Sequence, residues 1–151
     1  MDVDLDARLA EGSVPLGKMG LCLALLKNDA RFPWLLLVPM RPNITELFEL
    51  PAVHRHLLIE ETQRASRVIK EYFGVDKMNI ASLGNIVPQL HWHIVGRRVG
   101  DAAWPGPVWG VGEAEPYAAA DLDRFTADLP NLLGAQPMAA TTLTQAVDHY
   151  R

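Results

Sequence analysis

The sequence predicts an α+β fold in which one long helix packs on an antiparallel sheet of about five strands. Short apolar segments at 21–26 and 34–38 have the composition of buried strands, and a short turn-forming connection joins them. Segment 51–73 is longer and repeats its apolar residues at helical spacing. Segments 77–82 and 87–95 again have strand character. This order of strand, strand, helix, strand and strand, with short links, is typical of the class.

Glycine and proline mark the ends of the first elements. Residues 4–11 favour a short helix that Gly12 ends. The tripeptide at 15–17, Pro-Leu-Gly, is typical of a turn, so the first strand is expected after it. Pro51 suits the first turn of the long helix, and Gly74 suits its C-terminal cap.

The last third of the chain differs in composition from the sheet region. Segment 101–110 is rich in Pro, Gly and Trp, so it suits neither a helix nor a central strand. Residues 117–133 favour a helix that is broken or kinked near Pro130. Residues 141–149 favour one or two further helical turns. This part of the chain is therefore expected to add helices beside the sheet.

Length and charge limit the class of protein. The chain has 151 residues, 49% of them hydrophobic, and a formal charge of −4. This length suits a single domain over 1–151, with a core at about 20–110 and a C-terminal extension at about 111–151. The negative charge excludes broad, non-specific binding to nucleic acid, which depends on Lys and Arg side chains that neutralise phosphates.

The sequence has neither a membrane span nor a secretion signal of the usual kind. No segment approaches the run of about 20 apolar residues that crosses a bilayer, and the acidic N-terminus lacks the basic and apolar regions of a signal peptide. Cys22 is the only cysteine, so an internal disulfide cannot form. These observations predict a cytoplasmic protein with no membrane partner.

Polar and apolar side chains alternate along segment 87–95. The polar ones are Gln89, His91 and His93. In a strand, these three side chains point to the same face of the sheet. Burying such groups without partners costs about 1–3 kcal/mol each, so a core strand gains nothing from them. We therefore expect this face to open on a site that binds a ligand.

The residue types alone leave three roles open for the two histidines. The first role is a metal-binding pair, because neighbouring imidazoles suit Zn²⁺. The second is a catalytic nucleophile with a helper histidine, and the third is a pair without a chemical role. A zinc site needs three or four protein ligands, and no third ligand is obvious near this segment. The metal-site hypothesis is therefore weaker than the hypothesis of a catalytic nucleophile.

The segment resembles the signature of the histidine triad family, His-φ-His-φ-His-φ-φ, where φ is apolar. Here it reads Gln89-Leu90-His91-Trp92-His93-Ile94-Val95, followed by Gly96-Arg97. The resemblance extends upstream through the two apolar segments and the long helix, and covers roughly residues 20–110. The Trp-Pro-Gly-Pro tail at 104–107 is similar to a bacterial branch of the family. The family's fold agrees with the one predicted from the patterning.

The resemblance implies nucleotide phosphate chemistry without a cofactor or a metal. His91 would attack the α-phosphorus and carry the nucleotidyl group until water or another acceptor removes it. His93 would bind a phosphate oxygen and stabilise charge in the transition state. The substrates implied are nucleotides, dinucleoside polyphosphates or phosphoramidates. A homodimer is also implied, because many members of the family pair their sheets or helices.

Further residues gain a role from their place in the family pattern. Asn28 or Asp29 would meet the ribose hydroxyls, and Asn85 would donate hydrogen bonds to the phosphates. Trp104 belongs to segment 101–110, called the tryptophan loop below. This loop either caps the core or forms a rim beside the histidines and contacts substrate. Arg97 and its neighbour Arg98 either reach a distal phosphate or form a solvated strand end.

Two positions depart from the family pattern. Gln89 stands at the first histidine of the triad, and Trp34 stands where a fourth histidine often occurs upstream. The main-chain carbonyl at the first triad position helps to orient the nucleophile in the family, and Gln89 still supplies it. Protonation of the leaving group, or activation of the resolving water, is expected to be weaker. The alternative function is therefore a nucleotide-binding module with little or no turnover.

Overall fold

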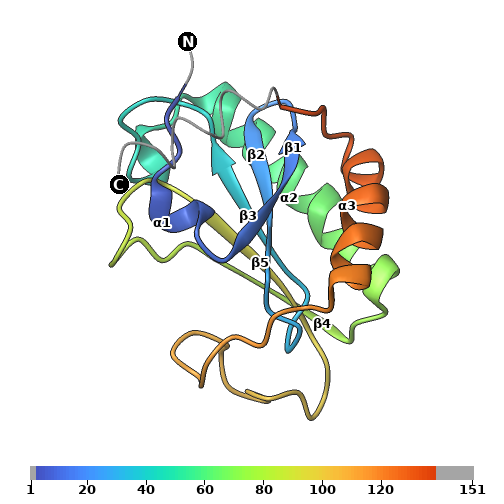
Figure 1. The fold of residues 1–151 in the computed structure, drawn as a ribbon. Helices are drawn as coiled ribbons and strands as arrows, with labels where there is room; N and C mark the ends of the chain where they lie inside the picture. The colour runs from blue at the N-terminus through green and yellow to red at the C-terminus, as the bar shows by residue number, and fades with distance from the viewer. Residues whose placement is uncertain (1–2, 139–151) are drawn as a thin grey trace.

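An antiparallel sheet of five strands forms the centre of the computed structural model, which describes residues 3–138. The strands are β1 (Ser13–Lys18), β2 (Cys22–Lys27), β3 (Trp34–Pro39), β4 (Lys77–Ala81) and β5 (Trp92–Arg97). They lie in the order β1-β2-β3-β5-β4 (Figure 1). The predicted α+β class is confirmed, and the short connection predicted between the first two apolar segments joins β2 and β3 as an antiparallel hairpin.

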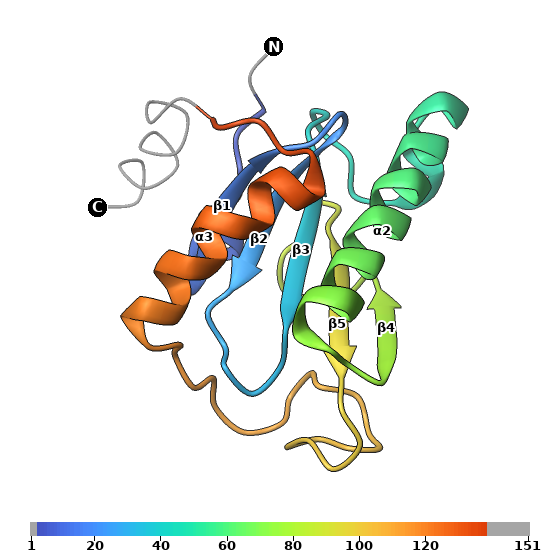
Figure 2. The ribbon, with the colours of Figure 1, turned by 90° about the vertical axis from the view of Figure 1, so that its right-hand side faces the viewer.

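The helices divide between the two faces of the sheet. They are α1 (Ala7–Ala10), α2 (Ala52–Phe73) and α3 (Ala119–Leu133), with a short 3-10 helix at Leu47–Glu49. Figure 2 shows α2 and α3 lying across the same face of the sheet, whereas α1 lies on the other side in Figure 1. The long helix α2 ends at Gly74, which has the left-handed conformation expected of a C-terminal cap.

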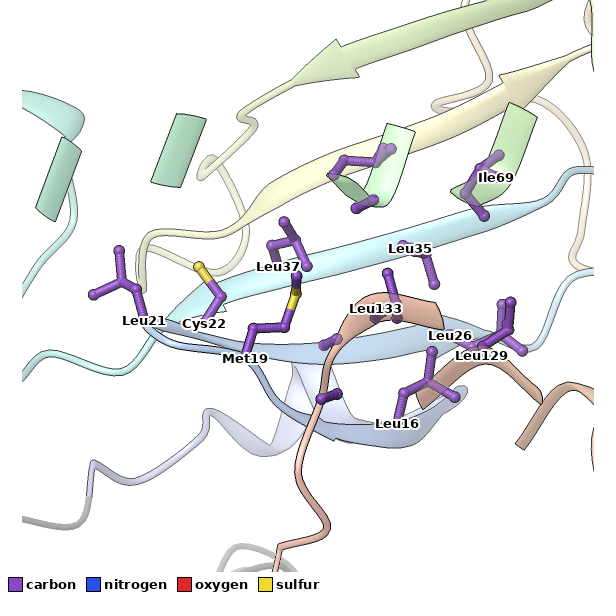
Figure 3. Close-up of a cluster of buried hydrophobic side chains, with 14 of the residues drawn as sticks. Leu16, Met19, Leu21, Cys22, Leu26, Leu35, Leu37, Ile69, Leu129 and Leu133 are labelled. Carbon is purple, nitrogen blue, oxygen red and sulfur yellow. The ribbon is translucent and has the colours of Figure 1, made fainter. Parts of the chain in front are cut away.

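A buried apolar cluster joins the sheet to α2 and α3. Side chains from β1, β2, β3 and β5 and from both helices meet in it, as Figure 3 shows for Leu16, Leu26, Leu35, Ile69 and Leu129. Alternate residues of each strand point into this cluster, as period-two patterning requires. The opposite face of the sheet is thereby left to the remaining side chains, which include both histidines.

A second apolar cluster covers that opposite face. Its members come from the N-terminal segment, from β2, β3 and β5, and from the loop that follows β5: they include Val3, Leu5, Leu9, Leu25, Leu36, Val95 and Val108. The N-terminal segment and the tryptophan loop therefore pack over the face that carries the histidines. This packing decides how much of the site remains exposed.

The turn predicted at 15–17 is wrong, because these residues belong to β1. Pro15 is tolerated because β1 is an edge strand, and a bulge separates it from Gly17. Gly17 has a φ of 126°, and a Cβ there would lie 2.5 Å from the carbonyl oxygen of Gln136. The glycine thus permits residue 136, which bridges to Lys18, to approach the strand.

The strand predicted at 87–95 begins later, at Trp92. The main-chain amide of Leu90 donates to the carbonyl of Ile44, 3.0 Å away, rather than to a sheet neighbour. Pro88 has no amide hydrogen to donate. His91 therefore lies just before β5, and His93 lies within it.

The predicted break at Pro130 is also wrong. Helix α3 continues through it and ends at Leu133, where Gly134 adopts the left-handed conformation. Pro130 cannot donate a hydrogen bond to the carbonyl four residues earlier, and the helix ends within one turn of it. The helical turns predicted at 141–149 lie outside the described residues.

Candidate active site

His91 and His93 lie side by side on the face of the sheet opposite α2 and α3. Their ring centroids are 4.9 Å apart. Both side chains are largely buried, with 4% of His91 and 7% of His93 exposed. The expected open face is thus mostly covered, and only small parts of the two imidazoles reach the surface.

A main-chain carbonyl sets the proton position of His91. The Nδ1 of His91 lies 2.7 Å from the carbonyl oxygen of Gln89. A carbonyl only accepts, so Nδ1 carries the hydrogen and Nε2 keeps a free lone pair. Nε2 has no hydrogen-bond partner within residues 3–138 and is not among their buried unpaired polar atoms, so it remains open to solvent. This is the protonation pattern of a nucleophilic imidazole.

Trp34 sets the opposite pattern on His93. The indole Nε1–H of Trp34 donates to Nδ1 of His93 over 3.1 Å. In neutral His93 the hydrogen therefore lies on Nε2, which becomes a donor. Burial, together with the nearby charges of His91 and Lys27, lowers the pKa of His93 to about 3. His93 is consequently a neutral hydrogen-bond donor at physiological pH.

Two tryptophans pack against His93. The Trp34 ring lies 5.6 Å from the His93 ring, and the Trp109 ring lies 5.3 Å from it at 85°. Trp109 comes from the loop after β5, and its indole Nε1 is buried without a partner within the described residues. The sequence singled out Trp104 from this loop and missed Trp109. The Trp104 ring instead packs against Arg97, whose guanidinium carbon lies 5.6 Å from the centroid of the ring.

The side chain of Gln89 faces the N-terminal segment. Its Oε1 accepts from the amide of Asp6 over 2.8 Å, and its Nε2 donates to the carbonyl of Asp4 over 3.1 Å. The two bonds use both ends of the amide. Of the three polar side chains expected to act together, the structure therefore brings together only His91 and His93, with Gln89 contributing its main-chain carbonyl.

The predicted ribose ligands lie at the end of β2. The Oδ1 of Asn28 accepts from the amide of Tyr117 over 2.8 Å. Asp29 is 2% exposed and forms an ion pair with Arg31 at 2.8 Å. Burial alone would raise the pKa of Asp29, but hydrogen bonds from Arg31 and from the amide of Glu115 lower it overall. Asp29 thus holds the loop between β2 and β3.

The remaining predicted groups lie on other parts of the surface or in the interior. Asn85 is exposed in the bend that precedes the histidine segment. Arg97 is 1% exposed, pairs with Asp101 at 2.8 Å and donates to Asn79, so it does not reach a phosphate. Arg98 is exposed and donates to the carbonyl of Phe73. Both alternatives for Arg97, a contact with a distal phosphate and a solvated strand end, are therefore wrong.

Within residues 3–138, no three His, Cys, Asp or Glu side chains are grouped closely enough to hold a metal ion. None of the helices in this range has the length and apolar character to cross a membrane.

The depressed pKa of His93 predicts a loss of stability in mild acid. The pKa of His93 is about 3 in the folded chain and 6.5 in a free histidine. Between these two pH values the unfolded chain binds a proton at this residue and the folded chain does not. This contribution is complete above pH 6.5 and is lost as the pH falls towards 3. Urea unfolding should give a free energy of unfolding lower by about 2 kcal/mol at about pH 5 than at about pH 7. In His93→Gln, this difference in the free energy of unfolding between the two pH values should shrink by the same amount. An unchanged difference would contradict the lowered pKa of His93.

Comparison with known proteins identifies the family. The family model of the HIT domain matches residues 11–100. A histidine triad protein from Bradyrhizobium japonicum is 44% identical, with a TM-score of 0.85 over 88% of this chain and 99% of that one. A histidine triad protein from Marinobacter aquaeolei VT8 is also 44% identical, with a TM-score of 0.85 over 89% of this chain and 98% of that one.

A third solved structure extends the agreement. A histidine triad protein from Sinorhizobium meliloti 1021 is 44% identical, with a TM-score of 0.82 over 89% of this chain and 97% of that one. No curated protein sequence matches the chain. The agreement runs over nearly the full length of all three bacterial proteins. The chain therefore belongs to the histidine triad, or HIT, family.

Proposed function

We propose that the protein is a nucleotide-phosphate hydrolase or nucleotidyl transferase that works through a nucleotidyl-histidine intermediate on His91. One observation carries the proposal. The Gln89 carbonyl holds the Nδ1 hydrogen of His91, which leaves the Nε2 lone pair free to attack phosphorus. Membership of the family supports a nucleotide as the ligand.

The chemistry has two displacement steps. In the first, Nε2 of His91 bonds to the α-phosphorus, and the bond from phosphorus to the leaving group breaks with its electron pair on the leaving group. In the second, water or another acceptor attacks the same phosphorus and loses a proton, and the bond to Nε2 breaks. Nε2–H of His93 donates to a non-bridging oxygen and stabilises charge in both steps.

We assign substrate binding to two asparagines near the ends of the strands. Asn28 has an amide nitrogen that its bond to Tyr117 leaves unused, which suits a ribose hydroxyl. Asn85 is exposed in the bend before the histidines, where its amide suits a phosphate oxygen. Asp29 is retained as the support of this loop rather than as a direct ligand, because Arg31 occupies its carboxylate.

A turnover assay tests the proposal. The protein is incubated with a dinucleoside polyphosphate and with a nucleoside phosphoramidate, and nucleoside monophosphate is measured. Release of the monophosphate from either substrate supports the proposed activity. Absence of product from both, with a correctly folded protein, would contradict it.

A nucleotide-binding module without turnover is the second candidate. It is favoured by one observation: both ends of the Gln89 amide are bonded to the N-terminal segment, which holds this side chain there rather than at the leaving group or the resolving water. Titration calorimetry separates the two candidates. The binding module predicts heat of nucleotide binding with no product, whereas the enzyme predicts both.

We also propose a homodimer, formed at β4 and the outer side of α2. Within the described part of the chain, β4 pairs only with β5, so its other edge offers unpaired main-chain groups. Ile80 on β4, and Val53 and Ile59 on α2, are large apolar side chains that are 45%, 62% and 54% exposed. A second copy of the chain would cover them.

Ile80→Lys should convert this dimer into a monomer, because the ammonium group cannot be buried in an apolar interface without a partner. Light scattering after size exclusion measures the mass directly. Leu132→Lys on α3 is the matched control, since Leu132 is 47% exposed and lies away from β4. A wild-type mass of one chain, or a dimer that survives Ile80→Lys, would contradict the proposed interface.

We place the activity in the cytoplasm. Cys22, the single cysteine of the chain, is a buried free thiol in the structure and suits a reducing compartment. Nucleotide substrates are also available there.

A further inference from the structure

An N-terminal strap, residues 3–10, lies beside the histidines. Val3, Leu5 and Leu9 anchor it in the apolar cluster on the histidine face of the sheet. Gln89 holds its main chain at two points, the carbonyl of Asp4 and the amide of Asp6. Because the same Gln89 carbonyl binds His91, the strap and the nucleophile share one support.

The outward side of the strap carries an ion pair next to His91. Both oxygens of Asp6 accept from the guanidinium of Arg8, at 2.7 and 3.0 Å. Arg8 also donates to the carbonyl of Ile86 over 2.9 Å, in the bend that leads to the histidines. Hydrogen bonds from Arg8 lower the pKa of Asp6 against the opposing effect of burial, and the charge of His91 adds to the lowering. Gln89 also links the two residues directly, because its side chain bonds the Asp6 amide and its carbonyl bonds His91, so the ion pair lies near the nucleophile.

Arg8 is well placed to bind an anion. Its side chain is 53% exposed, and an ion pair exposed to this degree contributes little to stability. A phosphate group of a polyphosphate chain can therefore take the place of the Asp6 carboxylate, because its two non-bridging oxygens accept the same two hydrogen bonds. Arg97, by contrast, is buried and held by Asp101.

The chemistry of the site also favours a particular leaving group. His93 accepts a hydrogen bond at Nδ1 and serves as a neutral donor at Nε2, and Gln89 is held by the strap. Neither the His93 imidazole nor the Gln89 amide is therefore placed to protonate an amine leaving group. A phosphate leaving group needs no such proton, because it departs as a stable anion.

We propose that Arg8 is a substrate-binding residue that recognises a phosphate beyond the one attacked by His91, so that the site prefers nucleoside polyphosphates to phosphoramidates. This inference rests on the proposed function, because it names the substrate class of the same site. Gln89 acts in it as a positioning residue: its amide holds the strap that carries Arg8.

The test compares kcat/KM for diadenosine tetraphosphate and for adenosine phosphoramidate. In Arg8→Gln, the ratio of the two values should fall by about tenfold to a hundredfold, the range expected for losing a hydrogen bond to a charged group. Arg124→Gln is the matched control: Arg124 forms an exposed pair with Asp121 at 2.8 Å on α3, and its loss should leave the ratio unchanged.

A second variant tests the strap itself. Gln89→Met removes both side-chain bonds to the strap but keeps the main-chain carbonyl that binds His91. It should lower the same ratio, and hydrogen exchange at the Asp6 amide should become faster than in the wild type and in Arg8→Gln. A retained slow exchange with an unchanged ratio would overturn the role of Gln89.

The outcomes separate this inference from the proposed function. If the wild type cleaves both substrates and Arg8→Gln leaves the ratio unchanged, the role of Arg8 is overturned while the proposed function stands. If the wild type cleaves neither, the proposed function fails, and the role of Arg8 fails with it.

Discussion

Replacing His91 with alanine should reduce turnover of a nucleotide substrate by about 10⁴-fold or more, the scale seen when a catalytic nucleophile is removed. The variant lacks the Nε2 lone pair that the Gln89 carbonyl keeps free in the wild type. Water would have to attack the phosphate directly, without the covalent intermediate. The change should appear in kcat far more than in KM, because His93 and the asparagines would still hold the substrate.

Turnover of the variant is measured beside His56→Ala, which removes an exposed imidazole from α2. His56→Ala should retain wild-type activity. Circular dichroism checks that both variants are folded. A His91→Ala protein that turns over at the wild-type rate would contradict the role given to His91.

Replacing Asp101 with alanine should lower the free energy of unfolding by about 3–5 kcal/mol, the cost of leaving a buried charge without its partner. Arg97 is 1% exposed, and both oxygens of Asp101 accept from its guanidinium at 2.8 Å. Asn79 supplies one further bond to Arg97 and cannot neutralise it. Arg97 lies at the end of β5, so the loss should loosen the strand that carries His93.

Urea unfolding measures this change at neutral pH. Asp121→Ala is the control, because Asp121 forms an exposed pair with Arg124 and its loss should cost no more than about 1 kcal/mol. Equal effects of the two substitutions would contradict the buried ion pair.

The same ion pair has a pH signature. The hydrogen bond from Arg97 lowers the pKa of Asp101 to about 2, from 3.8 in a free aspartate. The folded chain therefore releases this proton more readily than the unfolded chain. The contribution of the pair is present above pH 3.8 and is lost as the pH falls towards 2. In Asp101→Ala, the free energy of unfolding should no longer contain this fall between pH 3.8 and 2.

The fold could be predicted where one element carries its own pattern. The apolar segments of β2 and β3, and the apolar stripe of α2 ended by Gly74, are local signals, and the structure confirms them. Strand β1 was missed because Pro15 and Gly17 are turn formers. They are accepted there by an edge position, a bulge and the approach of residue 136, which are properties of the folded chain alone.

The site could be predicted only in part for a similar reason. The alternation around His91 and His93 placed the two imidazoles together. The partners that set their chemistry lie far away in sequence: Trp34 is 59 residues from His93, and Asp6 is 83 residues from Gln89. Pairings over such distances have no local signal.

Other polar groups were missed on the helix face of the sheet. Glu61 of α2 is buried, and its carboxylate accepts from the amides of Leu21 and Cys22 at 2.6 and 2.9 Å. Its position on the buried side of α2 is visible in the helical spacing. The two amides that it satisfies, at the start of β2, become its partners only when the helix packs on the sheet.

The most direct test of the account is capture of the covalent intermediate. The protein is mixed with a dinucleoside polyphosphate, quenched within milliseconds to seconds and digested at neutral to alkaline pH, where phosphorus–nitrogen bonds survive. Mass spectrometry should find one nucleotidyl group on the peptide that contains His91, and none in His91→Ala. Turnover without any adduct, or an adduct on another residue, would show that Nε2 of His91 is not the nucleophile.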